Sequence, residues 1–337
     1  MWATMAGRSE KLGWSGRCAT ITGIVALAAL LLMPQIARAA NYPNRSVRLI
    51  LPFGAGGVAD VTARLVTEKL GEKLGQRFVI ENMAGAGGIN AARAVLSAPP
   101  DGYTLALLSN GTAISVSLFK SLGFNPVTDF VPVSSMGYFD FIFVTQAGTP
   151  YGTLVEFIKA AKAKPGTLNV GTITAGSTQH LTAELFKSSA NVNFVIIPTK
   201  TSGEAVVSLL RDDVHMVIDF FAALRGTVVD GKARALAWSG PVPSPAMPEI
   251  PAAAQTVPGF EVVSWNSMAA PAGTSQAVID TLNKALREVL ADPALKQRAL
   301  EMGIDLKPST PAEAQARLVA DIKKWDEVIT KAGIQKQ

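Results

Sequence analysis

Glycines that follow a predicted strand and open a predicted helix are the residues of this chain whose spacing most clearly indicates chemistry. Gly54, Gly56 and Ala59 come after the apolar run 48–51 and match the pattern G-x-G-x-x-[G/A]. In dinucleotide-binding proteins that pattern places a pyrophosphate on the backbone amides of a helix N-terminus. Glu81 ends the next predicted strand, where such proteins keep the carboxylate that binds the ribose. One hypothesis is therefore a nucleotide-linked oxidoreductase.

Two observations favour a different function. His180 and His215 are isolated in the sequence, and no nucleophile and base accompany them. In addition, the glycine turn is not unique, because small or polar residues also follow other predicted strands, at 84–88, 109–112 and 174–179. A dinucleotide site needs one pyrophosphate turn, whereas this chain has several. We therefore expect a protein without catalytic residues, cofactor or metal site.

Backbone polarity offers a physical alternative to a nucleotide site. The first N–H groups of a helix lack intrahelical partners and carry partial positive charge. Glycine lets a ligand approach those groups closely because it has no Cβ atom. Several such turns facing one cleft would bind a small carboxylate without an arginine or lysine.

The elements that would hold these turns alternate regularly along the chain. Predicted strands at 48–51, 78–80, 103–108, 168–173, 194–197, 216–218 and 234–238 are mostly followed by amphipathic helices. Such alternation predicts an α/β fold with parallel strands covered on both faces. The last helix is the most clearly marked, because Thr310 and Glu313 form a capping box around Pro311.

The N-terminus resembles an export signal. Arg8, Lys11 and Arg17 precede the apolar run 21–33, and Ala37-Arg-Ala39 follows it. A basic region, a short apolar core and a small-x-small site are typical of a secretory signal peptide. The apolar run is too short to span a bilayer, which takes about 20 residues. We expect residues 1–40 to be a signal peptide cleaved near Ala39 or Ala40, and the protein to be exported.

Charge and cysteine content agree with an exported small-molecule receptor. The predicted leader takes three net positive charges from a total of +5, leaving +2 for residues 41–337. That balance gives no reason to expect a nucleic acid or an anionic membrane as partner. Cys18, the single cysteine, lies inside the leader, so we expect no disulfide in the exported chain.

The order of elements predicts two lobes. The strand–helix pattern restarts after Pro150, and helical segments finish the chain. If those helices pack on the first unit, two strands, near 139–144 and 262–268, connect the lobes as a hinge. We predict that residues 41–142 and 266–337 form lobe 1 and that residues 143–265 form lobe 2.

An ordered series of motifs resembles one protein family. Pro52-Phe-Gly-Ala-Gly-Gly-Val-Ala-Asp60, Glu81-Asn-Met-Ala-Gly-Ala-Gly-Gly88 and Pro100-Asp-Gly-Tyr-Thr-Leu105 look like successive motifs of the Bug (Bordetella uptake gene) receptors. These are the TctC-like substrate-binding proteins of tripartite tricarboxylate transporters. Further matching segments continue in the same order as far as Ala270-Pro-Ala-Gly-Thr274, and the resemblance covers residues 42–335.

The resemblance implies a periplasmic protein with a type II periplasmic-binding-protein fold that closes around a small organic acid. It implies a monomeric, non-enzymatic receptor that delivers this carboxylate to the membrane components of a tripartite tricarboxylate transporter. Carried over to this chain, the family's ligand-binding positions are Phe53, Gly54, Ala55, Gly56, Gly57, Asp60, Ser109, Thr112, Gly176, Ser177, Thr178, Thr199 and Asp219.

Two departures from the family pattern limit what can be carried over. The family often has Tyr where this chain has Thr199, and Asp-Asn where it has Asp219-Phe220. Both positions belong to the expected pocket wall, so the family's ligands do not transfer directly. A ligand-sensing subunit of a membrane signalling system stays open as an alternative to transport.

Overall fold

The computed structural model describes residues 42–337, and the predicted signal peptide lies outside the described residues. Residues 45–337 form one compact unit. Its strands are β1 (Val47–Leu51), β2 (Phe78–Asn82), β3 (Thr104–Ser109), β4 (Phe130–Gln146), β5 (Asn169–Ile173), β6 (Val195–Thr199), β7 (Met216–Phe220), β8 (Ala233–Trp238) and β9 (Val263–Pro271).

The helices largely follow the strands in sequence, as the α/β prediction requires. They are α2 (Val58–Leu74), α3 (Ile89–Leu96), α4 (Asn110–Leu118), α5 (Leu154–Ala163), α6 (Thr178–Ser189), α7 (Ser202–Leu210), α8 (Phe221–Val229), α9 (Gln276–Val289), α10 (Pro293–Leu300) and α11 (Pro311–Lys331). Helix α11 begins with the predicted capping box of Thr310 and Glu313.

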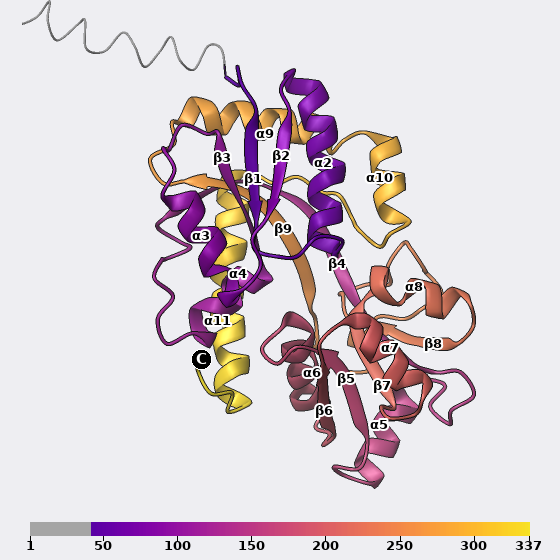
Figure 1. Cartoon of the computed structure of the whole chain (residues 1–337). Coiled ribbons are helices and arrows are strands. Elements are labelled where there is room, and N and C mark those ends of the chain that lie inside the picture. The colour runs from indigo at the N-terminus through magenta and orange to yellow at the C-terminus, as the bar shows by residue number, and fades with distance from the viewer. Residues whose placement is uncertain (1–41) are drawn as a thin grey trace, which may run out of the picture. The chain divides into compact units, whose positions relative to one another are not determined.

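The strands are joined in the order β2-β1-β3-β9-β4-β7-β5-β6, and β8 also pairs with β4. Strands β1, β2 and β3 are parallel, and so are β5, β6 and β7. Between these two groups stand β4 and β9, which run antiparallel to their neighbours (Figure 1). Strand β3 is buried along its whole length, as expected for a strand covered on both faces.

Strand β4 connects the two groups of strands. Its residues 130–140 pair with β9, whereas residues 141–146 pair with β7 and β8. We call β2, β1, β3, β9 and the beginning of β4 the first half of the sheet, and the remaining strands the second half. Helix α11 contacts β4, α4 and α6, so it packs against elements of both halves.

The core is continuous across this junction. One cluster of buried side chains runs from Ile50 and Leu108 in the first half to Phe143 and Phe186 in the second, and it includes Trp325 of α11. Burying each large apolar side chain contributes roughly 1.5–3 kcal/mol. This shared core fixes the ends of the strands and helices at the junction of the two halves.

Candidate ligand-binding pocket

A pocket of about 1100 Å³ lies where the two halves of the sheet meet. The first half contributes the turn before α2, the beginning of α4 and the loop after α10. The second half contributes the turn before α6 and the first turns of α7 and α8. The residues that line the pocket include Phe53, Gly54, Ala55, Gly56, Gly57, Val58, Ala59, Ser109, Thr112, Phe139, Gly176, Ser177, Thr178, Gln179, Ser202, Phe220, Ala222, Ala223, Arg225, Ser264, Asn266 and Glu301.

Helix N-termini converge on this pocket. Its wall includes first-turn residues of helices α2, α4, α6 and α8. The positive ends of helix dipoles therefore approach one cavity from both halves of the sheet, which favours a bound anion. This convergence is the arrangement expected if separate glycine turns serve a single ligand.

Helix α2 leaves its first amides open. Its N-cap is Gly57, and no side chain accepts a hydrogen bond from the first turn. The first backbone bond runs from the Val61 N–H to the Gly57 carbonyl. Val58 and Ala59 lie on the pocket wall, and the N–H groups of a first helical turn have no intrahelical acceptor. The amide of Gly56 has a different use, because it donates to Asp60 Oδ2 at 2.9 Å.

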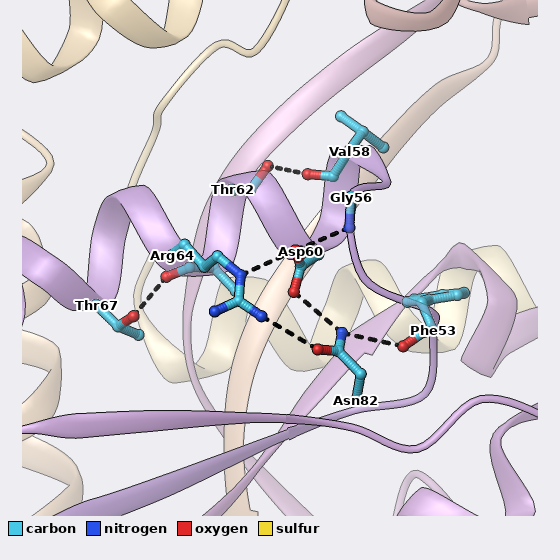
Figure 2. A network of polar contacts seen from close by, with 9 residues as sticks. Phe53, Gly56, Val58, Asp60, Thr62, Arg64, Thr67 and Asn82 are labelled. Atoms are coloured by element: carbon cyan, nitrogen blue, oxygen red, sulfur yellow. Dashed lines mark hydrogen bonds and ion pairs between the residues drawn. The ribbon is translucent and has the colours of Figure 1, made fainter.

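A polar network holds the turn before α2 in place (Figure 2). Asn82 Nδ2 donates to the Phe53 carbonyl at 3.1 Å and to Asp60 Oδ1 at 3.0 Å. Arg64 donates through Nε to Asp60 Oδ2 at 2.9 Å and through Nη2 to Asn82 Oδ1 at 3.2 Å. Both ends of the turn 53–56 are thereby tied to the same carboxylate and amide.

Asp60 thus has a structural role that it performs in the ionised state. It is buried and does not lie on the pocket wall. Burial alone would raise the pKa of Asp60, but hydrogen bonds from Arg64, the Gly56 N–H and Asn82 lower it below its usual value. The adjacent Arg64 offsets a negative charge that would otherwise repel an anion in the pocket.

Helix α4 differs from α2 because its own side chains cap it. Ser109 Oγ accepts from the Gly111 N–H at 3.1 Å, and Thr112 Oγ1 accepts from the Ser109 N–H at 3.2 Å. Both residues lie on the pocket wall. Their hydroxyl oxygens are nevertheless already engaged as acceptors within the capping box.

The turn before α6 is closed by its own hydrogen bonds. The Gly176 N–H donates to His180 Nδ1 at 3.1 Å, and Ser177 Oγ accepts from the His180 N–H at 3.1 Å. Burial lowers the pKa of His180, which keeps Nδ1 unprotonated as an acceptor. Gly176 has φ of +81°, and a Cβ there would stand 2.7 Å from Leu118 Cδ2 of α4. Glycine at this position therefore permits close contact between the two halves.

The structure brings ten of the thirteen predicted site residues to the pocket wall: Phe53, Gly54, Ala55, Gly56, Gly57, Ser109, Thr112, Gly176, Ser177 and Thr178. The other three, Asp60, Thr199 and Asp219, do not line it. Thr199 donates its hydroxyl hydrogen within the second half, where the carbonyls of Thr172 and Thr201 are the acceptors at 3.1 and 2.9 Å. Asp219 is fully buried behind the wall.

Several lining residues were not predicted from the sequence. Ser264 and Asn266 of β9 alternate with Trp265, so both point to the pocket face of the sheet. Asn266 is almost fully buried, and neither its amide nitrogen nor its oxygen has a hydrogen-bond partner. Gln179 and Ser202 add further polar atoms from α6 and α7. The stretch Ser264-Trp-Asn266 matches no sequence motif, so these positions could not be identified from the sequence.

The pocket wall is mostly uncharged. Phe139 and Phe220 form an apolar floor, with ring centroids 5.1 Å apart in an edge-to-face arrangement. Arg225 and Glu301, both exposed, are the charged residues among those that line the cavity. Apart from Arg225, the groups that could bind an anion inside are backbone amides and neutral polar side chains.

The nucleotide hypothesis finds no support in this geometry. Glu81 is not on the pocket wall and forms an ion pair with Arg48, with N–O distances of 2.6 and 2.7 Å.

Within residues 42–337 no three His, Cys, Asp or Glu side chains are grouped as metal ligands would be. In the same part of the chain, no helix is both long enough and apolar enough to cross a membrane.

Comparison with known proteins gives a consistent result. The model of the tripartite tricarboxylate transporter receptor family matches residues 62–334. The periplasmic binding protein BugD is 31% identical, covers 88% of this chain and 100% of its own, and superposes with a TM-score of 0.75. Its likeness confirms the α/β periplasmic-binding-protein fold.

Two similar structures carry bound acids. Rpa4515 of R. palustris, solved with adipate, is 32% identical with a TM-score of 0.79 and covers 88% of this chain and 100% of its own. MatC of Rhodopseudomonas palustris, solved with malate, is 29% identical with a TM-score of 0.73. The match covers 86% of this chain and 100% of MatC.

Proposed function

Because the chain belongs to the receptor family of tripartite tricarboxylate transporters, we propose that it captures a small carboxylate in the pocket between the two halves of its sheet. The observation that carries this proposal is the convergence of helix N-termini, including the uncapped α2, on one largely uncharged cavity. The acids bound by Rpa4515 and MatC support the same ligand class.

The ligand carboxylate sits between the turn 53–59 and the turn 176–179. Open amides of α2 hold it from the first half, while α6 approaches from the second. The two halves act as lobes, made of residues 41–142 with 266–337 and of residues 143–265. They close over the ligand by bending within β4, between its part that pairs with β9 and its part that pairs with β7, and in the chain that leads into β9.

A thermal-shift screen of organic acids tests the binding proposal. A ligand that binds only the folded protein raises its melting temperature by mass action, with about 2.7 kcal/mol of stabilisation at one hundred times its dissociation constant. Succinate, malate, adipate and citrate are the first probes, and NAD and NADP are the matched controls for the oxidoreductase alternative. A rise with the nucleotides and none with any acid would overturn the proposal.

Export and delivery are the remaining parts of the proposal. The receptor works in the periplasm and passes its acid to the membrane components of a tripartite tricarboxylate transporter. N-terminal sequencing of the secreted protein should begin at Ala40 or Asn41. Cross-linking in native membranes should recover transporter subunits with the acid-loaded receptor, whereas recovery of a membrane kinase would favour the sensing alternative.

A further inference from the structure

A buried acid stands directly behind the pocket wall. Asp219, at the end of β7, has no solvent-exposed surface, and no ion pair within residues 42–337 includes it. Its Oδ1 accepts from Gln179 Nε2 at 2.8 Å and from the Phe220 N–H at 2.7 Å. Its Oδ2 has no partner in full hydrogen-bond geometry, although the Ser202 hydroxyl faces the carboxyl group.

The buried carboxyl group of Asp219 determines which polar atoms the neighbouring Gln179 directs toward the pocket. A carboxylate offers only acceptors, so Gln179 must turn its NH₂ group toward Asp219. The remaining polar atom of the Gln179 amide, Oε1, is then an acceptor. Gln179 is almost fully buried yet lies on the pocket wall, and Ser202 lies there as well. Asp219 therefore sets the polarity of this part of the wall without reaching it.

Protonation of Asp219 would leave this orientation unchanged. Burial raises the pKa of Asp219, against the smaller lowering effects of Ser202, Gln179 and the Phe220 N–H. Oδ1 already receives two hydrogen bonds, so a proton would sit on Oδ2, on the side without a full partner. Oδ1 would still accept from Gln179 Nε2 in both protonation states.

We propose that Gln179 and Ser202 form a subsite for a hydrogen-bond donor on the ligand, a hydroxyl or ammonium group carried beside its carboxylate, and that Asp219 is the positioning residue of this subsite. The proposal rests on the proposed function and deepens it by naming the substrate class. The preferred ligand is a hydroxy acid or an amino acid rather than an unsubstituted dicarboxylic acid. A donor satisfies an acceptor that an unsubstituted acid leaves unpaired in a desolvated wall.

Calorimetric titration of the wild-type protein with three acids of one carbon skeleton tests the subsite. Malate or aspartate should bind about three- to tenfold more tightly than succinate, which corresponds to one net hydrogen bond. Malate above aspartate identifies a hydroxyl, and the reverse order identifies an ammonium group. Where the four-carbon acids do not bind, adipate is compared with 2-hydroxyadipate and 2-aminoadipate in the same way.

Equal or tighter binding of the unsubstituted acid overturns the proposed subsite, but it does not contradict the proposal that the protein is a carboxylate receptor. Binding of none of these acids, with a response to nucleotides, instead removes the proposed function and the subsite with it. The two failures are therefore distinguishable.

Variants separate positioning from simple stabilisation. Asp219→Ala removes the acceptor that orients the Gln179 amide, and Gln179→Met removes the acceptor offered to the ligand at similar volume. Both should bring the ratio of affinities for malate, or aspartate, over succinate close to one, while succinate affinity stays within about twofold. If Asp219 had only a structural role, the variant would lower the affinity for malate, aspartate and succinate equally. That result would contradict the proposal.

The matched control is a buried carboxyl group away from the pocket. Asp321 accepts from Trp265 Nε1 at 2.6 Å and from Arg317 Nε at 3.0 Å, and it does not line the cavity. Asp321→Asn should lower stability while keeping the wild-type preference among the acids. Loss of that preference in the control would show that any damage to the core changes selectivity, and it would overturn the role given to Asp219.

Discussion

At the scale of single residues, Asn82 is the side chain on which the shape of the first binding turn depends most. It joins the Phe53 carbonyl to Asp60, and Asp60 in turn holds the Gly56 N–H. Asn82→Ala removes these two hydrogen bonds and the one that Asn82 accepts from Arg64, and it leaves the turn free to move before the ligand arrives. We expect acid affinity to fall about five- to tenfold and stability to fall by about 1–2 kcal/mol.

Calorimetry and denaturant unfolding measure these two effects. Glu81→Gln on the same strand is the control, because it breaks an ion pair with Arg48 that is partly exposed and outside the pocket. That variant should bind acids like the wild type. If Asn82→Ala also did so, the turn would not need this network to keep its binding geometry.

Asp140 predicts how stability depends on pH. Burial, with added repulsion from Asp305 and Glu261, raises the pKa of Asp140 to about 7. The folded protein therefore holds this proton more tightly than the unfolded chain does, and folding loses free energy as the pH rises from about 4 to 7. Asp140→Asn removes this loss, so it should stabilise the protein above pH 7 and have little effect below pH 4.

The expected gain from Asp140→Asn is at most roughly 4 kcal/mol at pH 8, reduced by the partial exposure of the side chain. Melting temperatures of both proteins between pH 4 and pH 8 give the comparison. Parallel curves across that range would mean that Asp140 titrates normally in the folded state.

Sequence patterns located the glycine turns but not the residues that hold them. Gly54, Gly56 and Gly57 stand out because they follow a strand and open a helix. Asn82 acts from another strand, and its pairing with Phe53 depends on the parallel register of β1 and β2. Asn266 similarly reaches the pocket through the register of β9 against β3. Pairings of this kind arise from tertiary structure and leave no local signal.

At the scale of elements, the contrast between α2 and α4 explains which helix tip serves the ligand. Ser109 and Thr112 were predicted to bind the ligand, but they also cap α4. A hydroxyl at a helix start indicates a cap as readily as a binding site, and the sequence alone does not separate the two. Helix α2 starts at Gly57 and has no such cap.

The missing cap of α2 leads to a prediction with opposite effects on stability and binding. Gly57 has φ of −76° and ψ of 169°, and a Cβ there would meet nothing within 4 Å. Gly57→Ser should therefore cap the helix and raise stability by a few tenths of a kcal/mol. Its hydroxyl competes for the same amides, so acid affinity should fall about three- to tenfold.

Gly57→Ala is the control for Gly57→Ser, because it adds the Cβ without the competing oxygen. Thermal unfolding and titration of both variants separate the capping effect from the added bulk. Tighter acid binding by Gly57→Ser than by Gly57→Ala would indicate that the open amides of α2 do not hold the ligand.

Strand β4 is the element that the sequence described least well. The sequence predicted a linking strand near residues 139–144, and that segment is the later part of a longer strand, β4, which runs from Phe130 to Gln146. Pro132, Ser134 and Ser135 interrupt the apolar pattern of its first part, and its pairing with β9 shifts between 132 and 134 and between 135 and 137. Proline and small polar residues are uncommon inside a strand, and irregular pairing accommodates them here.

At the scale of the whole molecule, the two halves of the sheet share one core, and they also meet at two close contacts made by glycines. Gly176 allows the turn before α6 to meet Leu118, and Gly303 allows the loop after α10 to meet Phe221, where an added Cβ would stand 2.7 Å from Phe221 Cδ1. Leu118 and Phe221 are both buried, so separating these contacts would expose their apolar side chains. We propose that the lobes move by opening these contacts, while β4 and the chain that leads into β9 keep them joined.

Ligand-dependent closure predicts a change in distance between the halves. Glu68 on α2 and Lys162 on α5 are exposed, and residues 41–337 contain no cysteine. Spin labels at Glu68→Cys and Lys162→Cys therefore report the separation of the proposed lobes by pulsed electron resonance. A stabilising acid from the screen should move the distance distribution to shorter values. The acid gains amide contacts from both halves only in the closed form, and a ligand shifts an equilibrium by its differential affinity for the two forms.

A control pair at Glu68→Cys and Arg93→Cys, both on the first half, should give the same distance distribution with and without acid. If the pair that spans the pocket is equally insensitive at saturating acid, the two halves behave as one rigid body and the binding cleft is already complete without closure.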